Sequence, residues 1–249
     1  MISTEARGPV DVLVLDRPER RNALVPALAD ALAERLREIG ATGRPIVLTG
    51  AGSAFCVGAD LYWLGALDDP AEGVAEMVAA HHAVVSAMLH TPVPIIAAIN
   101  GPAAGGGLSL ALAADYRVAS TRATFTAAYF KLGLTPDGGS SLFLVRAIGL
   151  GRTMELLLTN RRLLAEEAAV WGLVNEVAPE AHLLEYACQA AERMLALEIP
   201  AATLLASRKL LDTTGLEAQL QRESVAIRTA ARQPAFRKAL RAFLEDQQH

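Results

Sequence analysis

Two glycine-bearing segments of this 249-residue chain could supply backbone donors to a ligand. The first, TGAGSAFCVGADL (49–61), follows a short apolar run, and its Gly58 permits a positive φ that turns the next N–H outward. The second, IAAINGPAAGGGLSLALAAD (96–115), runs through glycines into a helix of small residues. Because N–H groups at a helix start are unpaired and carry partial positive charge, the second segment suits a developing oxyanion.

A third segment, FTAAYFKLGLTPDGGSS (125–141), places Asp137 between a proline and two glycines. Proline, aspartate and glycine in this order are typical of a turn, and aspartate is a good helix N-cap. The residues alone leave both interpretations of Asp137 open.

Two rival motifs share the glycine segments. The dinucleotide fingerprint G-x-G-x-x-G fails at Phe55, which stands where the third small residue should pack. The stretch GLSLA (107–111) approximates the nucleophile elbow of serine hydrolases, with Ser109 as nucleophile and alanine in place of the last glycine. Such an enzyme needs a histidine later in the chain, and His182 is the candidate, although it is expected on a solvent-facing helix.

The elements that must position these segments alternate between strands and helices. Apolar runs predict strands at 10–15, 45–49, 94–99 and 115–119, and helical spacing predicts helices at 25–39, 71–89 and 107–114. This alternation indicates an α/β fold with helices covering a sheet. The last 50 or so residues predict helices only, with apolar faces that either cover their own core or form a subunit interface.

Composition excludes several classes of protein. The net charge of −4 argues against a nucleic-acid partner. The two cysteines form no metal or redox motif, no metal site is expected, and no apolar stretch has the composition of a membrane span. With an N-terminus unlike a signal peptide, a cytoplasmic location is expected. Cys56 is predicted to be buried rather than nucleophilic, and His81, His82 and His90 are predicted surface or core residues, one of which could line the pocket.

Taken together, five pieces of the sequence resemble the crotonase superfamily, also called the enoyl-CoA hydratase/isomerase family. They are RPERRNAL (17–24), AFCVGADL (54–61), INGPAAGGGLSLALAAD (99–115), FKLGLTPDGG (130–139) and LTNRRLLAEEAAVWGLVNEV (158–177). The pieces occur in the order and spacing of that family. The resemblance implies a ββα spiral core over 1–195 and a C-terminal helical region over 196–249 that forms a homotrimer or a dimer of trimers. It also implies an acyl-CoA thioester substrate and no separate cofactor.

The resemblance also implies roles for particular residues. The N–H groups of Ala59 and Gly106 would form the oxyanion hole, with Asp137 as the catalytic carboxylate. The substrate-binding residues would be Arg21, Asn22, Ala23, Leu24, Ala59, Asp60, Leu61, Gly105, Gly106, Tyr129, Leu132 and Pro136. Within this set Asp60 is expected to brace its loop.

The expected reaction depends on which carboxylates this chain has at the catalytic positions of the resembled family. Hydratases of the family use two glutamates, and at the matching positions this chain has Ser109 and Tyr129. A subset with P-D-G-G or P-D-A-G uses the aspartate to isomerise enoyl-CoA, and Asp137 matches that pattern. Burial is expected to raise the pKa of Asp137 and strengthen it as a base. Isomerisation is therefore the expected activity, with hydration or a non-catalytic acyl-CoA-binding role as alternatives.

Overall fold

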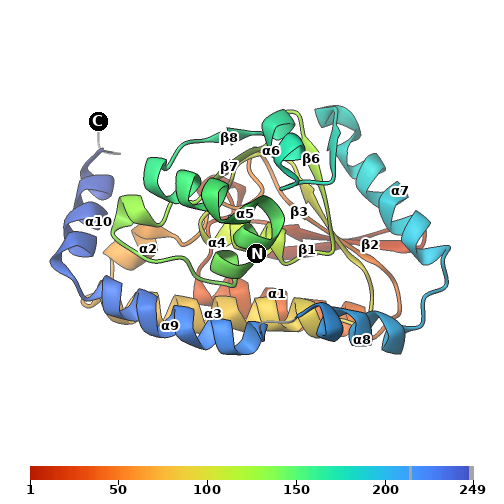
Figure 1. The fold of residues 1–249 in the computed structure, drawn as a ribbon, viewed down its shortest axis with the longest axis horizontal. Coiled ribbons are helices and arrows are strands. Elements are labelled where there is room, and N and C mark those ends of the chain that lie inside the picture. Colours follow the sequence, from red (N-terminus) through yellow and green to blue (C-terminus); the bar gives the residue numbers. More distant parts are fainter. Residues whose placement is uncertain (213–214, 247–249) are drawn as a thin grey trace.

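A six-stranded sheet forms the centre of the molecule in the computed structural model, which describes residues 1–212 and 215–246 (Figure 1). Its strands lie in the order β1 (Ile2–Arg7), β2 (Val10–Leu15), β3 (Ile46–Gly50), β4 (Ile95–Ile99), β6 (Tyr116–Ser120) and β9 (Glu176–Ala178). Only the β1–β2 pair within this sheet is antiparallel, and the others are parallel. Parallel pairing directs the loops after β3 and β4, which carry the glycine segments, to the same edge of the sheet.

Alternating side chains bury both faces of the sheet. In β2, Val10 and Val12 face the helix α7 (Leu183–Leu195), whereas Leu13 and Leu15 belong to the main core on the opposite face. The alternation follows from the period of two in a strand, and the doubly buried parallel strands are accordingly β-branched and aliphatic. The predicted α/β class is therefore confirmed.

The main core lies under two long helices and a small second sheet. Helix α1 (Pro26–Gly40) packs against α3 (Pro70–His90), and each has a proline in its first turn. The other α-helices and strands between β3 and β9 are α2 (Leu61–Gly65), β5 (Ala103–Ala104), α4 (Gly106–Leu112), β7 (Thr124–Thr126), α5 (Ser140–Thr159), β8 (Leu163–Leu164) and α6 (Ala165–Trp171). Strands β5, β7 and β8 form the second sheet, and α4 packs against α5.

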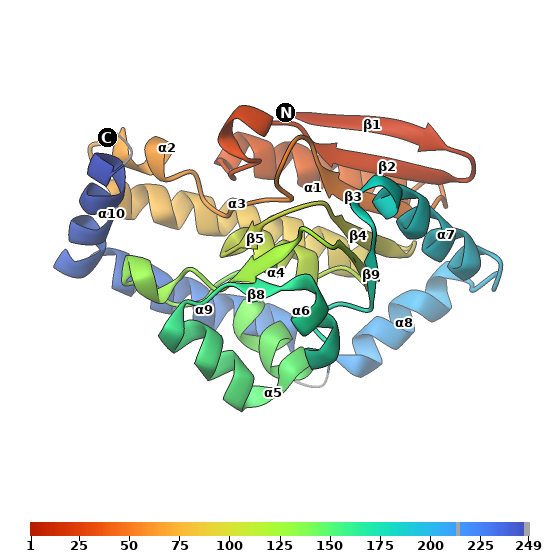
Figure 2. The ribbon, with the colours of Figure 1, turned by 90° about the horizontal axis from the view of Figure 1, so that it is seen from above.

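Three helices follow the core, namely α8 (Ala201–Leu211), α9 (Leu216–Ala231) and α10 (Pro234–Asp246). Helix α9 lies along α3, and α10 reaches α2 (Figures 1 and 2). The predicted apolar face of α9 is buried at Leu216, Leu220, Ile227 and Ala231, so this helix covers its own core. Residues 213–214 and 247–249 of the predicted C-terminal region lie outside the described part of the chain.

The predicted strands and helices agree with the structure to within about two residues. Among the elements that were not predicted, the longest helix is α5 and the longest strand is β1. Its side chains are almost all exposed, so it lacks the apolar alternation that marks a strand. It forms because β2 offers a free edge, to which β1 pairs in an antiparallel hairpin. Among the described residues, no helix is long and apolar enough to cross a membrane.

Candidate active site

A cavity of about 600 Å³ lies where the glycine loops meet α3 and the C-terminal helices. The predicted residues that line it are Leu24, Gly58, Ala59, Leu61, Gly105, Gly106, Tyr129, Leu132 and Asp137. Its remaining lining is mainly apolar and comes from Val57, Leu64, Val74, Met77, Val78, His81, Ala128, Lys131, Leu134, Ile227, Ala239, Ala242, Phe243 and Asp246. Segments far apart in the sequence therefore meet around one space.

The turn at Gly58 brings the two glycine loops into contact. Gly58 adopts φ +87°, as its expected left-handed role requires. A Cβ at this position would lie 2.8 Å from the carbonyl oxygen of Ala104 and 3.2 Å from the nitrogen of Gly106. On the other side, the N–H of Leu24 donates to the Gly58 oxygen at 2.7 Å. The turn is therefore held between two neighbouring segments without room for a side chain.

The amides of Ala59 and Gly106 are available to a ligand. Both residues line the cavity, and neither N–H donates to an acceptor within residues 1–212 and 215–246. Gly106 begins α4, where N–H groups have no partner inside the helix. Since Gly58 lies against Gly106, these two unpaired donors belong to separate loops that border one cavity.

Asp137 lies in the same cavity and is buried, with an exposed fraction of 7%. Its Oδ2 is 3.7 Å from Nδ1 of His81. Burial acts to raise the pKa of Asp137, but the neighbouring side chains of His81, His82 and Tyr129 outweigh this effect, so the pKa is lowered. The prediction of a raised pKa is thus wrong.

Two side chains fix the turn that carries Asp137. Gly138 donates its N–H to Nε2 of His82 at 3.1 Å, and the Tyr129 hydroxyl donates to the Asp137 backbone oxygen at 3.3 Å. Burial lowers the pKa of His82 to about 4, and the charge of His81 also lowers it, against opposing effects of Asp137 and Glu217. His82 is therefore a neutral acceptor at neutral pH. The hydroxyl of Tyr129 stays protonated, because burial raises its pKa well above the usual value.

This arrangement predicts acid-sensitive stability. Because the pKa of His82 falls from 6.5 in the unfolded chain to about 4 in the fold, its contribution is complete above pH 6.5 and is lost as the pH falls towards 4. The shift corresponds to at most about 3 kcal/mol. His82→Gln, which keeps an acceptor, should have a smaller loss of unfolding free energy in acid. Denaturant unfolding of both proteins across this pH range measures the difference, and parallel pH curves would contradict it.

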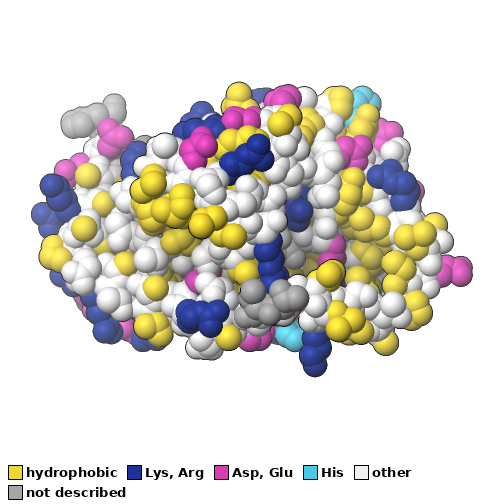
Figure 3. Space-filling view, viewed as in Figure 1, with side chains coloured by type: hydrophobic (Ala, Val, Ile, Leu, Met, Phe, Trp, Pro, Cys, Tyr) yellow, Lys and Arg dark blue, Asp and Glu magenta, His cyan; other side chains and the backbone are white. Residues whose placement is uncertain are grey.

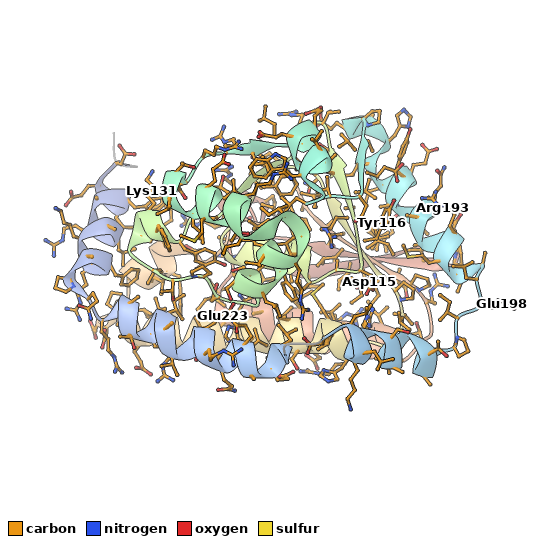
Figure 4. The ribbon with its side chains drawn as sticks, in the orientation of Figure 1. Asp115, Tyr116, Lys131, Arg193, Glu198 and Glu223 are labelled. Carbon is orange, nitrogen blue, oxygen red and sulfur yellow. The ribbon has the colours of Figure 1, made fainter. Side chains whose placement is uncertain are left out.

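Glu223, labelled in Figure 4, anchors the same turn from α9. Its carboxylate accepts the N–H of Gly139 at 2.7 Å and the N–H of Ser141 at 3.2 Å, together with the Ser141 hydroxyl. These N–H groups begin α5, so Glu223 acts as an N-cap supplied by a different helix. Burial raises the pKa of Glu223, although these hydrogen bonds oppose the rise.

We expect Glu223→Ala to lower the unfolding free energy by about 2–3 kcal/mol, because buried donors at the start of α5 lose a charged acceptor. Glu223→Gln keeps an acceptor oxygen and should lose less. Glu217→Ala is the matched control, since Glu217 is an exposed glutamate of the same helix bonded to Ser86. Equal destabilisation by the Glu217 and Glu223 alanine variants in urea unfolding would refute the capping role.

Ser109 is hydrogen-bonded inside the fold and is not exposed to the cavity. Its hydroxyl donates to the Gly106 oxygen at 3.0 Å and lies 3.1 Å from Nε2 of His81. The side chain is fully buried and is absent from the cavity lining. His182, the partner expected for a serine hydrolase, is exposed and contacts Glu185 at 2.9 Å. The pairing of Ser109 with His182 is therefore wrong, because the fold places His81 beside the serine instead.

Several predicted binding residues lie outside the cavity lining, namely Arg21, Asn22, Ala23, Asp60 and Pro136. The Asn22 side chain accepts the N–H of Arg17 and donates to the oxygens of Ala51 and Ala54, so it fixes the loop. Asp60 caps α2 and pairs with Arg17 at 3.0 Å, so its side chain is engaged within its own loop. Arg21 is exposed.

Other groups are accounted for by burial. Cys56 is buried, and burial raises the pKa of its thiol to about 12, so it is not a reactive thiolate. No cluster of metal-binding side chains occurs among residues 1–212 and 215–246.

Sequence reasoning missed the contributions of His82, Glu223 and α10. Only the helical spacing of 71–89 could have indicated that one histidine faces inward.

Known proteins share this organisation. A family model described as enoyl-CoA hydratase/isomerase matches residues 5–249. A probable enoyl-CoA hydratase of Rhodobacter capsulatus is 37% identical over 94% of this chain and 91% of its own length. The 1,2-epoxyphenylacetyl-CoA isomerase of Escherichia coli is 35% identical over 94% and 92%. The 4-chlorobenzoyl coenzyme A dehalogenase-2 of Arthrobacter is 40% identical over 72% and 67%.

The resemblance extends to three dimensions. The crystal structure of enoyl-CoA hydratase from Bacillus halodurans matches with a TM-score of 0.86 and 29% identity, covering 97% of this chain and 99% of that chain. The agreement thus extends over nearly the whole chain. With two unpaired backbone donors and a carboxylate around one cavity of this fold, the chain belongs to the enoyl-CoA hydratase/isomerase family of the crotonase superfamily.

Proposed function

We propose that this protein moves the double bond of an enoyl-CoA thioester, using Asp137 as the base. The observation that carries the proposal is the presence of this buried carboxylate in one cavity with the unpaired amides of Ala59 and Gly106. Asp246 also lines the cavity, but it is exposed at the end of α10. Asp137 is therefore the buried carboxylate that could reach a bound acyl group.

The reaction needs one proton carrier and one anion site. Asp137 would take a proton from Cα or Cγ, and the electron pair would move onto the thioester oxygen as a dienolate. The N–H groups of Ala59 and Gly106 would hold that oxygen, and the proton would return to the other carbon. Since loss of one such donor costs about 2.7–4 kcal/mol in other enzymes, two could supply much of the barrier reduction.

Hydration is less well supported by the site. The positions of the two glutamates expected of hydratases are occupied by Ser109 and Tyr129. Ser109 is bonded to the Gly106 oxygen, and the Tyr129 hydroxyl is bonded to Asp137 and Ser140. His81 is nevertheless a second titratable group in the cavity, so hydration is retained as the alternative.

The mainly apolar lining of the cavity would accommodate an apolar acyl group. Leu24, Leu61 and Leu132 would contact the substrate there. We propose that Arg21, Asn22 and Ala23 border the CoA portion through their loop, and that Pro136 orients Asp137. Coenzyme A enters as part of the substrate, and the proposal includes no other cofactor. Two free cysteines are consistent with a cytoplasmic location.

We further propose that residues 196–249 assemble the protein as a homotrimer or a dimer of trimers. Helix α8 has no buried residue, and Leu210 and Leu211 are exposed. Leu197 and Ile199 are exposed in the link from α7. Hydrophobic side chains also gather over the α7–α8 end of the molecule (Figure 3). A subunit interface would cover this apolar surface, and light scattering would measure the assembly.

The activity test compares three thioesters with the purified protein. A 3-enoyl-CoA should become conjugated, which ultraviolet absorbance detects, whereas a 2-enoyl-CoA should gain water slowly or not at all. 4-Chlorobenzoyl-CoA should release no chloride. Faster hydration or chloride release would replace the isomerase proposal. Tight binding of all three without turnover would indicate a non-catalytic acyl-CoA-binding protein.

A further inference from the structure

The imidazole of His81 lies between the oxyanion site and the carboxylate. A Cβ built on Gly106 would be 3.2 Å from Cε1 of His81, and Nδ1 of His81 is 3.7 Å from Oδ2 of Asp137. His81 lines the cavity with an exposed fraction of 2%. The ring is therefore adjacent to both parts of the proposed reaction.

The hydroxyl of Ser109 determines which ring nitrogen carries the proton. Its single hydrogen is donated to the Gly106 oxygen at 3.0 Å, as is common for serine inside a helix. The Ser109 oxygen can then contact Nε2 of His81 at 3.1 Å only as an acceptor. With the Ser109 hydrogen on the Gly106 oxygen, Nε2 carries the hydrogen of this contact, and Nδ1 of the neutral imidazole bears the lone pair.

This tautomer directs a proton acceptor at Asp137. The 3.7 Å between Nδ1 and Oδ2 exceeds a hydrogen bond, as expected for a lone pair opposite a carboxylate. When Asp137 gains a proton, its O–H can donate to Nδ1, and the contact can shorten. A hydrogen bond between His81 and Asp137 therefore requires one additional proton. The proposed reaction would deliver that proton from the substrate.

We propose that His81 is a second proton-transfer residue, which accepts at Nδ1 the proton that Asp137 removes from the substrate, while Ser109 positions it. The inference rests on the proposed function. The C–H bond breaks, its electron pair moves to the thioester oxygen, and the proton passes through Asp137 to Nδ1. The resulting imidazolium stands beside Gly106 and offsets the dienolate charge. The proton then returns through Asp137 to the other carbon, and the pair regains its starting state.

The other titratable groups around His81 do not compete with Asp137 for Nδ1. His82 lies 6.5 Å away between ring centroids and is neutral near pH 7 because of its lowered pKa. Tyr129 is protonated, and Glu223 is engaged by the start of α5. Asp137 is therefore the acidic partner at Nδ1, and Ser109 is the partner at Nε2.

The kinetic test replaces each member of the relay. His81→Gln should lower kcat for double-bond migration by about 10²-fold, the lower part of the range for acid–base catalysis, and remove one limb of its pH profile. Ser109→Ala should lower kcat by about two- to tenfold, the equivalent of one hydrogen bond, and Ser109→Thr should restore it. His90→Gln, an exposed histidine of the same helix, is the control. Binding of a saturated acyl-CoA should stay unchanged in the His90→Gln control and change far less than kcat in the other three.

A tautomer measurement keeps this inference separate from the isomerase proposal. Nitrogen-15 NMR of labelled histidines, assigned by difference from His81→Gln, should show the Nε2–H form in the wild type and a mixture in Ser109→Ala. If wild-type His81 carries its proton on Nδ1, or if His81→Gln keeps wild-type kcat and pH profile, the relay is overturned. If the wild type moves no double bond, the proposed function fails, and the NMR spectrum still decides the Ser109–His81 arrangement.

Discussion

Replacing Asp137 by asparagine is expected to lower kcat for double-bond migration by about 10²–10⁴-fold, because the amide cannot accept the substrate proton. The shape of the site should survive. The Tyr129 hydroxyl bonds to the backbone oxygen of Asp137, and His82 bonds to the N–H of Gly138, so neither contact uses the carboxylate. Binding of a saturated acyl-CoA, measured by calorimetry, should therefore be retained while turnover is lost.

Asp246→Asn is the matched control for this result. Asp246 also lines the cavity, but it is an exposed residue at the end of α10. Its amide variant should keep nearly wild-type turnover. Loss of turnover in both variants would assign the effect to the charge of the cavity, and retention of turnover in Asp137→Asn would remove this residue as the base.

Gly58→Ala should be nearly as damaging, although it alters neither a titratable group nor a side chain of the cavity. The new Cβ would lie 2.8 Å from the Ala104 oxygen and 3.2 Å from the Gly106 nitrogen, so one loop must move. The two amides would then no longer converge. Since removal of one oxyanion donor costs about 10²–10³-fold in kcat, we expect a loss of that order. Steady-state kinetics with a 3-enoyl-CoA measure it.

Gly43→Ala separates this effect from backbone strain. Gly43 also has a positive φ, +77°, but a Cβ there would meet nothing within 4 Å. Both alanine variants carry the strain of the left-handed region, and only the Gly58 variant disturbs the oxyanion site. Comparable stability losses with a selective loss of kcat at Gly58 are the expected pattern. An unaltered kcat in Gly58→Ala would show that the spacing of the two loops is not important for turnover.

The local parts of the fold could be predicted because their signals are local. The apolar run of β2 and the helical spacing of α1 and α3 are patterns of residues close together in the sequence. The structure has the predicted strand and helices at these positions. Strand β1 was not predicted, because its stability comes from the edge of β2 and its own side chains are exposed. Gly58 was identified because positive φ restricts the residue type at a turn.

The rest of the site depends on how distant segments meet. His81, Ser109 and Asp137 come from α3, α4 and the turn before α5, and no spacing in the sequence places them together. The capping contact of Glu223 joins α9 to α5 across more than 80 residues. The lowered pKa of Asp137 has the same origin, since burial was foreseeable but the histidines that oppose it were not.

The most direct test of the proposed enzyme is a crystal structure with a bound saturated acyl-CoA. Such a ligand has no double bond to move and stays intact in the site. The thioester oxygen should lie about 2.7–3.1 Å from the nitrogens of both Ala59 and Gly106, the distance of an oxyanion donor. Cα should then lie on the Asp137 side of the bound acyl group. A thioester oxygen that contacts neither amide, or an acyl group held outside this cavity, would contradict the proposed enzyme.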